Sequence, residues 1–316
     1  MSNNVLKLNY PIRISAIRGF ENRANDIVYC QPLSGKECPE AVVLFPGDVQ
    51  DYTENMLAHR DNKNHKDWSL DNTAFRMQQK FPKCHILVVK PSRMDFKTFS
   101  CFKNFVESDN LGVPHHTANY NSLTHLDKLI QNVSSWLNDL SQMELNDLLS
   151  VSKKAVTCMS NDDVMNHEDS ASNYHKNIRD CNLKLVGFSK GCVVLNQMLH
   201  EFHTVMNSHI NEDYTSFISR ISDMYWLDGG HSGGKNTWIT DKDILQTLAL
   251  LEIKVHIHLS PYQIEDDRRP WIRKEEKIFS DVLKRLGCNI QRYIHFEGLP
   301  SSIMLHFNVY DAFKPV

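Results

Sequence analysis

One serine of this 316-residue chain lies in a setting that favours nucleophilic chemistry. Ser189 is the centre of a Gly-x-Ser-x-Gly sequence that begins at Gly187 and ends at Gly191. The apolar run Leu183 to Val186 predicts a buried strand before it, and residues at helical spacing follow it. Strand, sharp turn and helix are the context of a nucleophile elbow. Glycine on both sides relieves the steric collisions of such a turn. The alternative is an ordinary strand-to-helix turn with a capping serine.

A second Gly-x-Ser-x-Gly sequence, Gly230 to Gly234, lacks this context. It lies in a glycine cluster, and the residues after it show no amphipathic helical pattern. We therefore expect Ser232 to be a loop serine. The cluster also lacks the glycine spacing of phosphate-binding loops, which argues against a nucleotide cofactor. No cofactor of any kind is expected.

A serine hydroxyl attacks well only when a base takes its proton and a carboxylate orients that base. Downstream of Ser189, His306 is the best candidate base. It follows the last predicted strand and stands at the head of the closing helix. His295 is expected to be packed inside that strand.

Two positions could supply the acid. Asp228 directly follows a predicted strand and begins an Asp-Gly-Gly loop, and it is the preferred candidate. Asp266 and Asp267 follow the next strand at a greater distance, where they could simply pair with Arg268 and Arg269. An aspartate that starts a glycine turn is also common without any catalytic role.

A tetrahedral intermediate needs two N–H donors aimed at its negative oxygen. In an elbow, the residue after the serine supplies one, which here is Lys190. The second is expected from the loop after the strand that ends at Phe45, at Gly47 or Asp48. The alternative for this loop is a plain Pro-Gly turn.

Metal-dependent chemistry is not indicated. His256 and His258 alternate on one predicted strand with no third ligand nearby, and the eight cysteines show no zinc spacing. We therefore expect no metal, and we interpret the cysteines as reduced structural thiols.

Composition narrows the class of protein. The net charge is −3 and charged residues are 23%, so nothing indicates a nucleic-acid partner. No run of about eighteen apolar residues exists, so no membrane span is expected. The first twenty residues resemble a transit peptide only faintly, and a first strand over 5–17 is preferred. One domain over 1–316 is expected, with a polar, partly disordered insertion at about 150–180.

Strands and helices alternate along the chain. Other strands are predicted at 26–30, 41–45, 85–89, 222–227, 254–259 and 289–296. Helices are predicted from residue 73, capped by Asp71 or Asn72, and over 122–149, 271–286 and 303–313, besides the helix after Ser189. Residues 59–72 are predicted to be a loop, and 254–259 a strand with one wetter face. Residues 91–121 are irregular and aromatic, either a lid or rings that cover the sheet edge. The pattern predicts a doubly wound, mostly parallel sheet with helices on both faces.

Four stretches carry a resemblance to a known family: Leu44 to Gln50, Leu185 to Asn196, Trp226 to His231, and Arg268 to Glu276. From about residue 13 onward the chain resembles the metazoan family called chromosome-two open-reading-frame sixty-nine, which is similar to α/β-hydrolases of the serine-esterase kind. The resemblance implies an α/β-hydrolase-like fold and an association with mitochondria. It also places the nucleophile on Ser189 and supports Asp228 and His306 by position.

These observations predict a metal-independent serine hydrolase. Its substrate would be a small acyl or lipid-like ester, thioester or amide, attacked by Ser189. The alternative is an inactive hydrolase scaffold that binds or regulates another protein, which the sequence does not identify. A mitochondrial location is expected from the resemblance, with the cytoplasm as the alternative.

Overall fold

The computed structural model describes residues 10–33, 40–110, 112–141, 143–144, 147–148, 177–208 and 212–315. Most of the insertion predicted at about 150–180 lies outside the described residues. The strand predicted over 5–17 is described only from residue 10, and strand β1 spans Ile12–Arg18.

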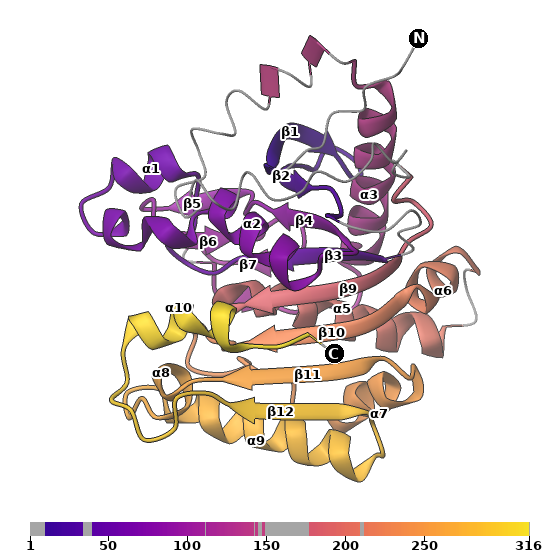
Figure 1. The fold of residues 1–316 in the computed structure, drawn as a ribbon. Helices are drawn as coiled ribbons and strands as arrows, with labels where there is room; N and C mark the ends of the chain where they lie inside the picture. Colours follow the sequence, from indigo (N-terminus) through magenta and orange to yellow (C-terminus); the bar gives the residue numbers. More distant parts are fainter. Residues whose placement is uncertain are drawn as a thin grey trace.

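An eight-stranded sheet runs through the molecule in the order β1-β2-β4-β3-β9-β10-β11-β12 (Figure 1). Strand β2 is antiparallel to β1 and to β4, and the other neighbouring pairs are parallel. The remaining strands of this sheet span Ala24–Cys30 (β2), Glu40–Phe45 (β3), His85–Val89 (β4), Asn182–Phe188 (β9), Ile221–Leu227 (β10), Lys254–Leu259 (β11) and Ile290–Ile294 (β12). The predicted mostly parallel sheet is confirmed.

Helices cover both faces of the sheet, as predicted (Figure 1). One apolar cluster lies under the larger layer, made of α3 (Ser122–Asp139), α5 (Cys192–Asn207), α6 (Glu212–Ser219), α7 (Lys242–Leu250) and α9 (Pro270–Arg285). A second cluster lies on the opposite face, under η1 (Asn62–Trp68), α2 (Leu70–Lys80) and α10 (Ile303–Ala312). The short helices α1 (Thr53–Leu57) and α8 (Pro261–Ile264) belong to loops at the end of the sheet.

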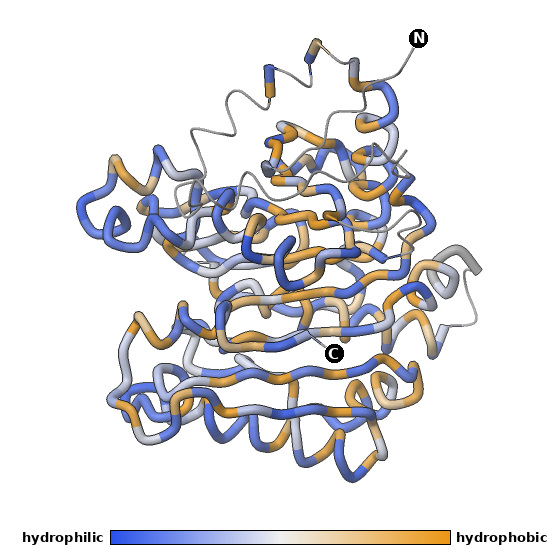
Figure 2. Tube along the Cα trace, in the orientation of Figure 1, coloured by the Kyte–Doolittle hydropathy of each residue, from blue (hydrophilic) through white to orange (hydrophobic). Residues whose placement is uncertain are grey.

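Double coverage explains why the central strands are apolar at consecutive positions instead of alternating. Every residue of β4 is buried, for example. Figure 2 shows hydrophobic residues concentrated along the strands of the sheet. Within the described residues, no helix combines the length and the apolar character needed to span a bilayer.

Several element boundaries differ from the predictions. Helix α2 begins at Leu70, because the Ser69 hydroxyl caps it by accepting from the Asn72 N–H at 3.3 Å. The caps predicted at Asp71 and Asn72 are therefore wrong, and η1 lies inside the predicted loop over 59–72. Helix α3 ends at Asp139, ten residues before the predicted end at 149.

The wetter face predicted for β11 is wrong. His256 and His258 are 1% and 2% exposed. His256 stacks on Tyr225 and its Nε2 lies 2.8 Å from the Asp223 carboxylate. His258 forms a 2.9 Å hydrogen bond with His295. One ring nitrogen of each buried histidine has a partner distant in the chain, which periodicity within one strand does not reveal.

The aromatic region over 91–121 forms two small hairpins, β5 (Arg93–Asp95) with β6 (Phe99–Cys101), and β7 (Glu107–Ser108) with β8 (Pro114–His115). Phe102 and Phe105 are buried and pack edge-on against Phe45 at the end of β3. Phe96 is 74% exposed. Phe102 and Phe105 therefore cover the sheet, as one of the two interpretations of this region expected, whereas Phe96 does not.

Candidate active site

Ser189 lies on a strained turn at the end of β9. It begins the short helix η2 (Ser189–Gly191), and its φ of 53° is in the left-handed region that L residues avoid. A Cβ at position 187 would lie 2.3 Å from Leu195 Cδ1, and one at 191 would lie 1.9 Å from the Phe45 carbonyl oxygen. The steric requirement for both glycines is therefore present as predicted.

The connections that follow β3 and β9 run toward opposite edges of the sheet. From β3 it continues to β4, and from β9 to β10, although β3 and β9 are neighbours. Divergent connections of this kind open a crevice at the carboxyl ends of the two strands. A cavity of about 240 Å³ lies there. It is lined by Asp48 and Val49 after β3, by Ser189 after β9, and by His306 from α10.

Asp228 and His306 meet beside this cavity. Asp228 follows β10 with a φ of 47°, and it is fully buried. Its Oδ2 accepts a 2.6 Å hydrogen bond from His306 Nδ1. Because Nδ1 donates to the carboxylate, Nε2 is the imidazole nitrogen left to accept a proton. Within the described residues, no hydrogen bond joins His306 to Ser189, and such contacts are often long in ligand-free sites.

Two aromatic rings hold the His306 imidazole between them. The Phe188 ring, next to Ser189 in the chain, stacks at 4.6 Å between centroids, and the Tyr262 ring of α8 stacks at 4.7 Å. The interplanar angles are 29° and 30°. His306 is thus restrained by packing on both faces as well as by Asp228.

Ser260, which no sequence motif singles out, anchors the Asp228 carboxylate. Its N–H donates to Oδ1 at 2.6 Å, and its hydroxyl donates to Oδ2 at 2.5 Å. Ser260 directly follows β11 and is fully buried. Its position could have indicated this role, because the segment after β11 was one of the two places where the catalytic acid was expected.

The alternative acids lie elsewhere. Asp266 binds Arg268 and Arg269, each at 2.9 Å, as suspected. Asp267 is exposed. Ser232 is exposed in a loop, as predicted, although it lines the rim of the same cavity.

The expected donor at Gly47 needs a correction. The Gly47 N–H donates to Gln50 Oε1 at 2.8 Å, so its hydrogen points to that side chain. Of the two residues suggested for the second donor, Asp48 remains. The Asp48 side chain has partners of its own, because its Oδ1 accepts from Ser100 N at 2.7 Å and lies 3.6 Å from Lys190 Nζ. Burial raises the pKa of the Asp48 carboxyl, and the Lys190 ammonium counteracts that shift.

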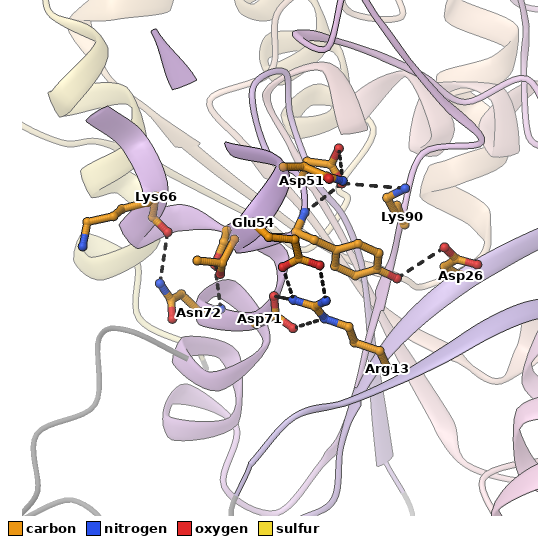
Figure 3. Close-up of polar contacts among 12 residues, drawn as sticks. Arg13, Asp26, Asp51, Glu54, Lys66, Asp71, Asn72 and Lys90 are labelled. Carbon is orange, nitrogen blue, oxygen red and sulfur yellow. Dashed lines mark hydrogen bonds and ion pairs between the residues drawn. The ribbon is translucent and has the colours of Figure 1, made fainter. Parts of the chain in front are cut away.

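A polar cluster fixes the segment that follows β3 (Figure 3). The Arg13 guanidinium binds the Asp71 carboxylate through two 2.7 Å bonds and Glu54 at 2.6 Å and 3.0 Å. Its carbon also lies 4.0 Å from the centre of the Tyr52 ring. Bidentate pairs of this type are geometrically specific. The cluster therefore ties α1, which follows the loop that begins with Gly47, and α2 to β1.

No metal centre is evident in the part of the chain that the structure describes, where no three His, Cys, Asp or Glu side chains gather. His256 and His258 point to different partners, Asp223 and His295.

Comparison with known families gives one match over most of the chain. Residues 13–289 match the family described as C2orf69. The mouse relative named "Mitochondrial protein C2orf69 homolog" is 38% identical over 307 residues, covering 92% of this chain and 83% of the relative. The human "Mitochondrial protein C2orf69" is 39% identical over 291 residues, covering 86% and 74%. The zebrafish homologue is 34% identical over 316 residues, covering 96% and 85%.

Solved structures with similar folds include esterases. Esterase Est22 matches with a TM-score of 0.44 and 10% identity, covering 95% of this chain and 76% of the esterase. A thermostable esterase matches with a TM-score of 0.41 and 10% identity, covering 92% and 56%. At 10% identity, the likeness to these esterases is one of fold.

Proposed function

The chain belongs to the C2orf69 family, and we propose that it is a serine hydrolase that acts on esters, thioesters or amides. The observation that carries the proposal is the 2.6 Å bond between Asp228 and His306 Nδ1, in a cavity wall that His306 shares with Ser189. The positive φ of Ser189, at the end of a buried strand, supports it.

In the proposed reaction, Ser189 Oγ attacks the carbonyl carbon of the substrate and His306 Nε2 takes the hydroxyl proton. The N–H groups of Lys190 and Asp48 stabilise the oxyanion. The carbon–heteroatom bond then breaks, and the leaving group takes the proton from His306. Water, deprotonated by the same imidazole, attacks the acyl-enzyme and releases the acid.

Asp228 is suited to the part of the orienting acid. It accepts three hydrogen bonds, two from Ser260 and one from His306, so its oxygens are satisfied although it is buried. Its carboxylate holds the imidazole in the tautomer that leaves Nε2 free for Ser189. The Phe188 and Tyr262 rings restrict the imidazole further, so the His306 side chain loses little conformational freedom when the reaction begins.

Labelling with a fluorescent fluorophosphonate tests the proposal. We expect wild type to react and Ser189→Ala not to react. Ser232→Ala is the matched control, because Ser232 stands in the second Gly-x-Ser-x-Gly sequence and lines the same cavity. It should label like wild type. Unreactive wild-type protein, or labelling that persists in Ser189→Ala, would favour the inactive scaffold instead.

We also propose a mitochondrial location, because the mouse, human and zebrafish relatives are each named a mitochondrial protein. Fractionation of cells that express the tagged full-length protein tests this. Co-sedimentation with a mitochondrial matrix or membrane marker is expected, and recovery in the cytosolic fraction alone would contradict it.

A further inference from the structure

The residue after Ser189 carries a buried ammonium group that has no part in the proposed reaction. The Lys190 side chain is only 2% exposed, and a lysine is seldom buried unless it is paired. Its Nζ lies 3.6 Å from Asp48 Oδ1 and 5.5 Å from the centre of the Phe99 ring. A Cβ at Gly112 would lie 2.9 Å from the same nitrogen. The ammonium is therefore enclosed, and Asp48 provides the opposite charge.

The two partners of this ion pair come from segments that touch each other. Asp48 lies in the loop after β3, and Lys190 lies in the turn after β9. A Cβ at Gly47 would lie 2.7 Å from Ser189 Cβ, so the loop passes directly against the turn. The backbone N–H groups of Asp48 and Lys190 are the two donors of the proposed oxyanion hole. The ion pair therefore links the residues that carry the two donors.

The β5–β6 hairpin holds the Asp48 side of this link. The Ser100 N–H and hydroxyl donate to Asp48 Oδ1 at 2.7 Å and 2.9 Å. The Val49 N–H donates to the Thr98 carbonyl at 2.7 Å. Val49 has a φ of 74°, which is unfavourable for a β-branched residue, so this turn depends on support from outside. Within the described residues, the Asp48 N–H makes no hydrogen bond, which leaves it available to an oxyanion.

Both donors lie beyond the strands that the sheet holds in register. β3 ends at Phe45 and β9 ends at Phe188, so the hydrogen bonds of the sheet fix neither N–H directly. An oxyanion hole stabilises the transition state only when its donors are held where the negative charge develops. A side-chain link between the two segments opposes their relative displacement. An enclosed ion pair is a stronger link than one in open solvent.

We propose that the ion pair between the Asp48 and Lys190 side chains positions the two N–H donors of the oxyanion hole. The backbones of both residues contact the oxyanion, and their side chains act as positioning groups that keep the donors in place. Ser100 and Thr98 extend this link to the β5–β6 hairpin. The inference rests on the proposed function, because it concerns the oxyanion formed at Ser189.

Three variants test the inference: Asp48→Asn, Lys190→Met and the double variant. All three keep both backbone N–H groups, so any loss of activity comes through the side chains. Asp48→Asn also keeps an oxygen that can accept from Ser100. The double variant leaves no unpaired charge, so it tests the proposal even if a single variant unfolds. Steady-state hydrolysis of p-nitrophenyl acetate gives kcat and KM, and complete labelling with a fluorophosphonate counts the active sites.

We expect each single variant to lower kcat by about tenfold with little change in KM, because a misplaced donor weakens the transition state more than the bound ester. The double variant should lose the same factor and not the product of the two, since either substitution alone already breaks the pair. The rate of fluorophosphonate labelling should fall by a similar factor, which is a readout that does not require turnover of the ester.

Lys184→Met is the matched control. Lys184 is also buried and its Nζ lies 2.9 Å from Asp223 Oδ2, but this pair lies near the amino ends of β9 and β10, at the opposite end from Ser189. Its midpoint of unfolding in urea should fall, because a buried carboxylate loses its partner. Its kcat should equal that of wild type.

The outcomes separate the two proposals. Wild-type kcat in the double variant, losses that multiply from the single variants to the double, or an equal loss of kcat in Lys184→Met overturns the role of the ion pair. A higher kcat in Asp48→Asn with a lower kcat in Lys190→Met also overturns it, because that result indicates a direct effect of charge on the oxyanion. Each of these results leaves the hydrolase proposal intact when wild type labels at Ser189. Wild type that does not label overturns both proposals.

Discussion

Replacing Ser260 with alanine should weaken catalysis without touching any group that reacts. The substitution removes the hydroxyl that donates to Asp228 Oδ2 at 2.5 Å. It keeps the Ser260 N–H bond to Oδ1 at 2.6 Å and the His306 bond to Oδ2 at 2.6 Å. Oδ2 would then be bound by His306 alone, so the carboxylate could rotate about its anchored Oδ1 and carry Oδ2 out of line with the imidazole.

The size of the effect follows from the type of bond. A hydrogen bond to a charged group contributes about 1.5–3 kcal/mol, and the buried carboxylate cannot turn to water instead. We therefore expect the free energy of unfolding to fall by about that amount. If the same energy is lost from the positioning of His306, kcat falls about tenfold to a hundredfold, with KM little changed.

Urea unfolding and steady-state hydrolysis of p-nitrophenyl acetate, corrected for titrated active sites, measure the two effects. Ser260→Thr keeps a hydroxyl and should recover most of the kcat. The matched control is Ser280→Ala, because Ser280 donates to the buried Glu276 carboxylate at 2.6 Å, away from the cavity. It should lose comparable stability but no activity. Wild-type kcat in Ser260→Ala, or an equal loss of kcat in Ser280→Ala, would refute this reasoning.

Two further perturbations test the scaffold. Gly191→Ala would place a Cβ 1.9 Å from the Phe45 carbonyl oxygen, so we expect a loss of at least about 1–3 kcal/mol in unfolding free energy and of Ser189 labelling. Full stability in urea would contradict that geometry. His125 accepts from the Phe20 N–H at 3.0 Å, and burial, aided by the Arg23 charge, lowers its pKa to about 3. Between pH 6.5 and about 3, His125 binds a proton in the unfolded chain but not in the folded chain, so the free energy of unfolding falls as pH falls. His125→Gln should reduce the pH dependence of that free energy by up to about 1.4 kcal/mol per pH unit. An unchanged pH dependence in the variant would contradict the lowered pKa of His125.

The features that could be predicted from the sequence are local ones. The strand before Ser189, its flanking glycines and the helix after it leave their pattern within about twenty consecutive residues. The mostly parallel character of the sheet follows because apolar strands alternate with amphipathic helices. Both predictions depend only on the spacing and the size of side chains that are close in the sequence.

The features that were missed depend on partners distant in the chain. The Gly47 N–H is occupied by Gln50, and Gln50 is itself held by Trp68 and Thr73. The burial of His258 depends on residues near the end of the chain, such as Phe313, which packs against its ring. Neither arrangement has a periodic signature.

The most direct measurement is to trap the acyl-enzyme itself. Wild-type protein mixed with excess p-nitrophenyl acetate and quenched in acid within the burst should carry one acetyl group, and peptide mapping by mass spectrometry should place it on Ser189. An unmodified Ser189 peptide, or an acetyl group located on Lys190 or Ser232 instead, would contradict the account.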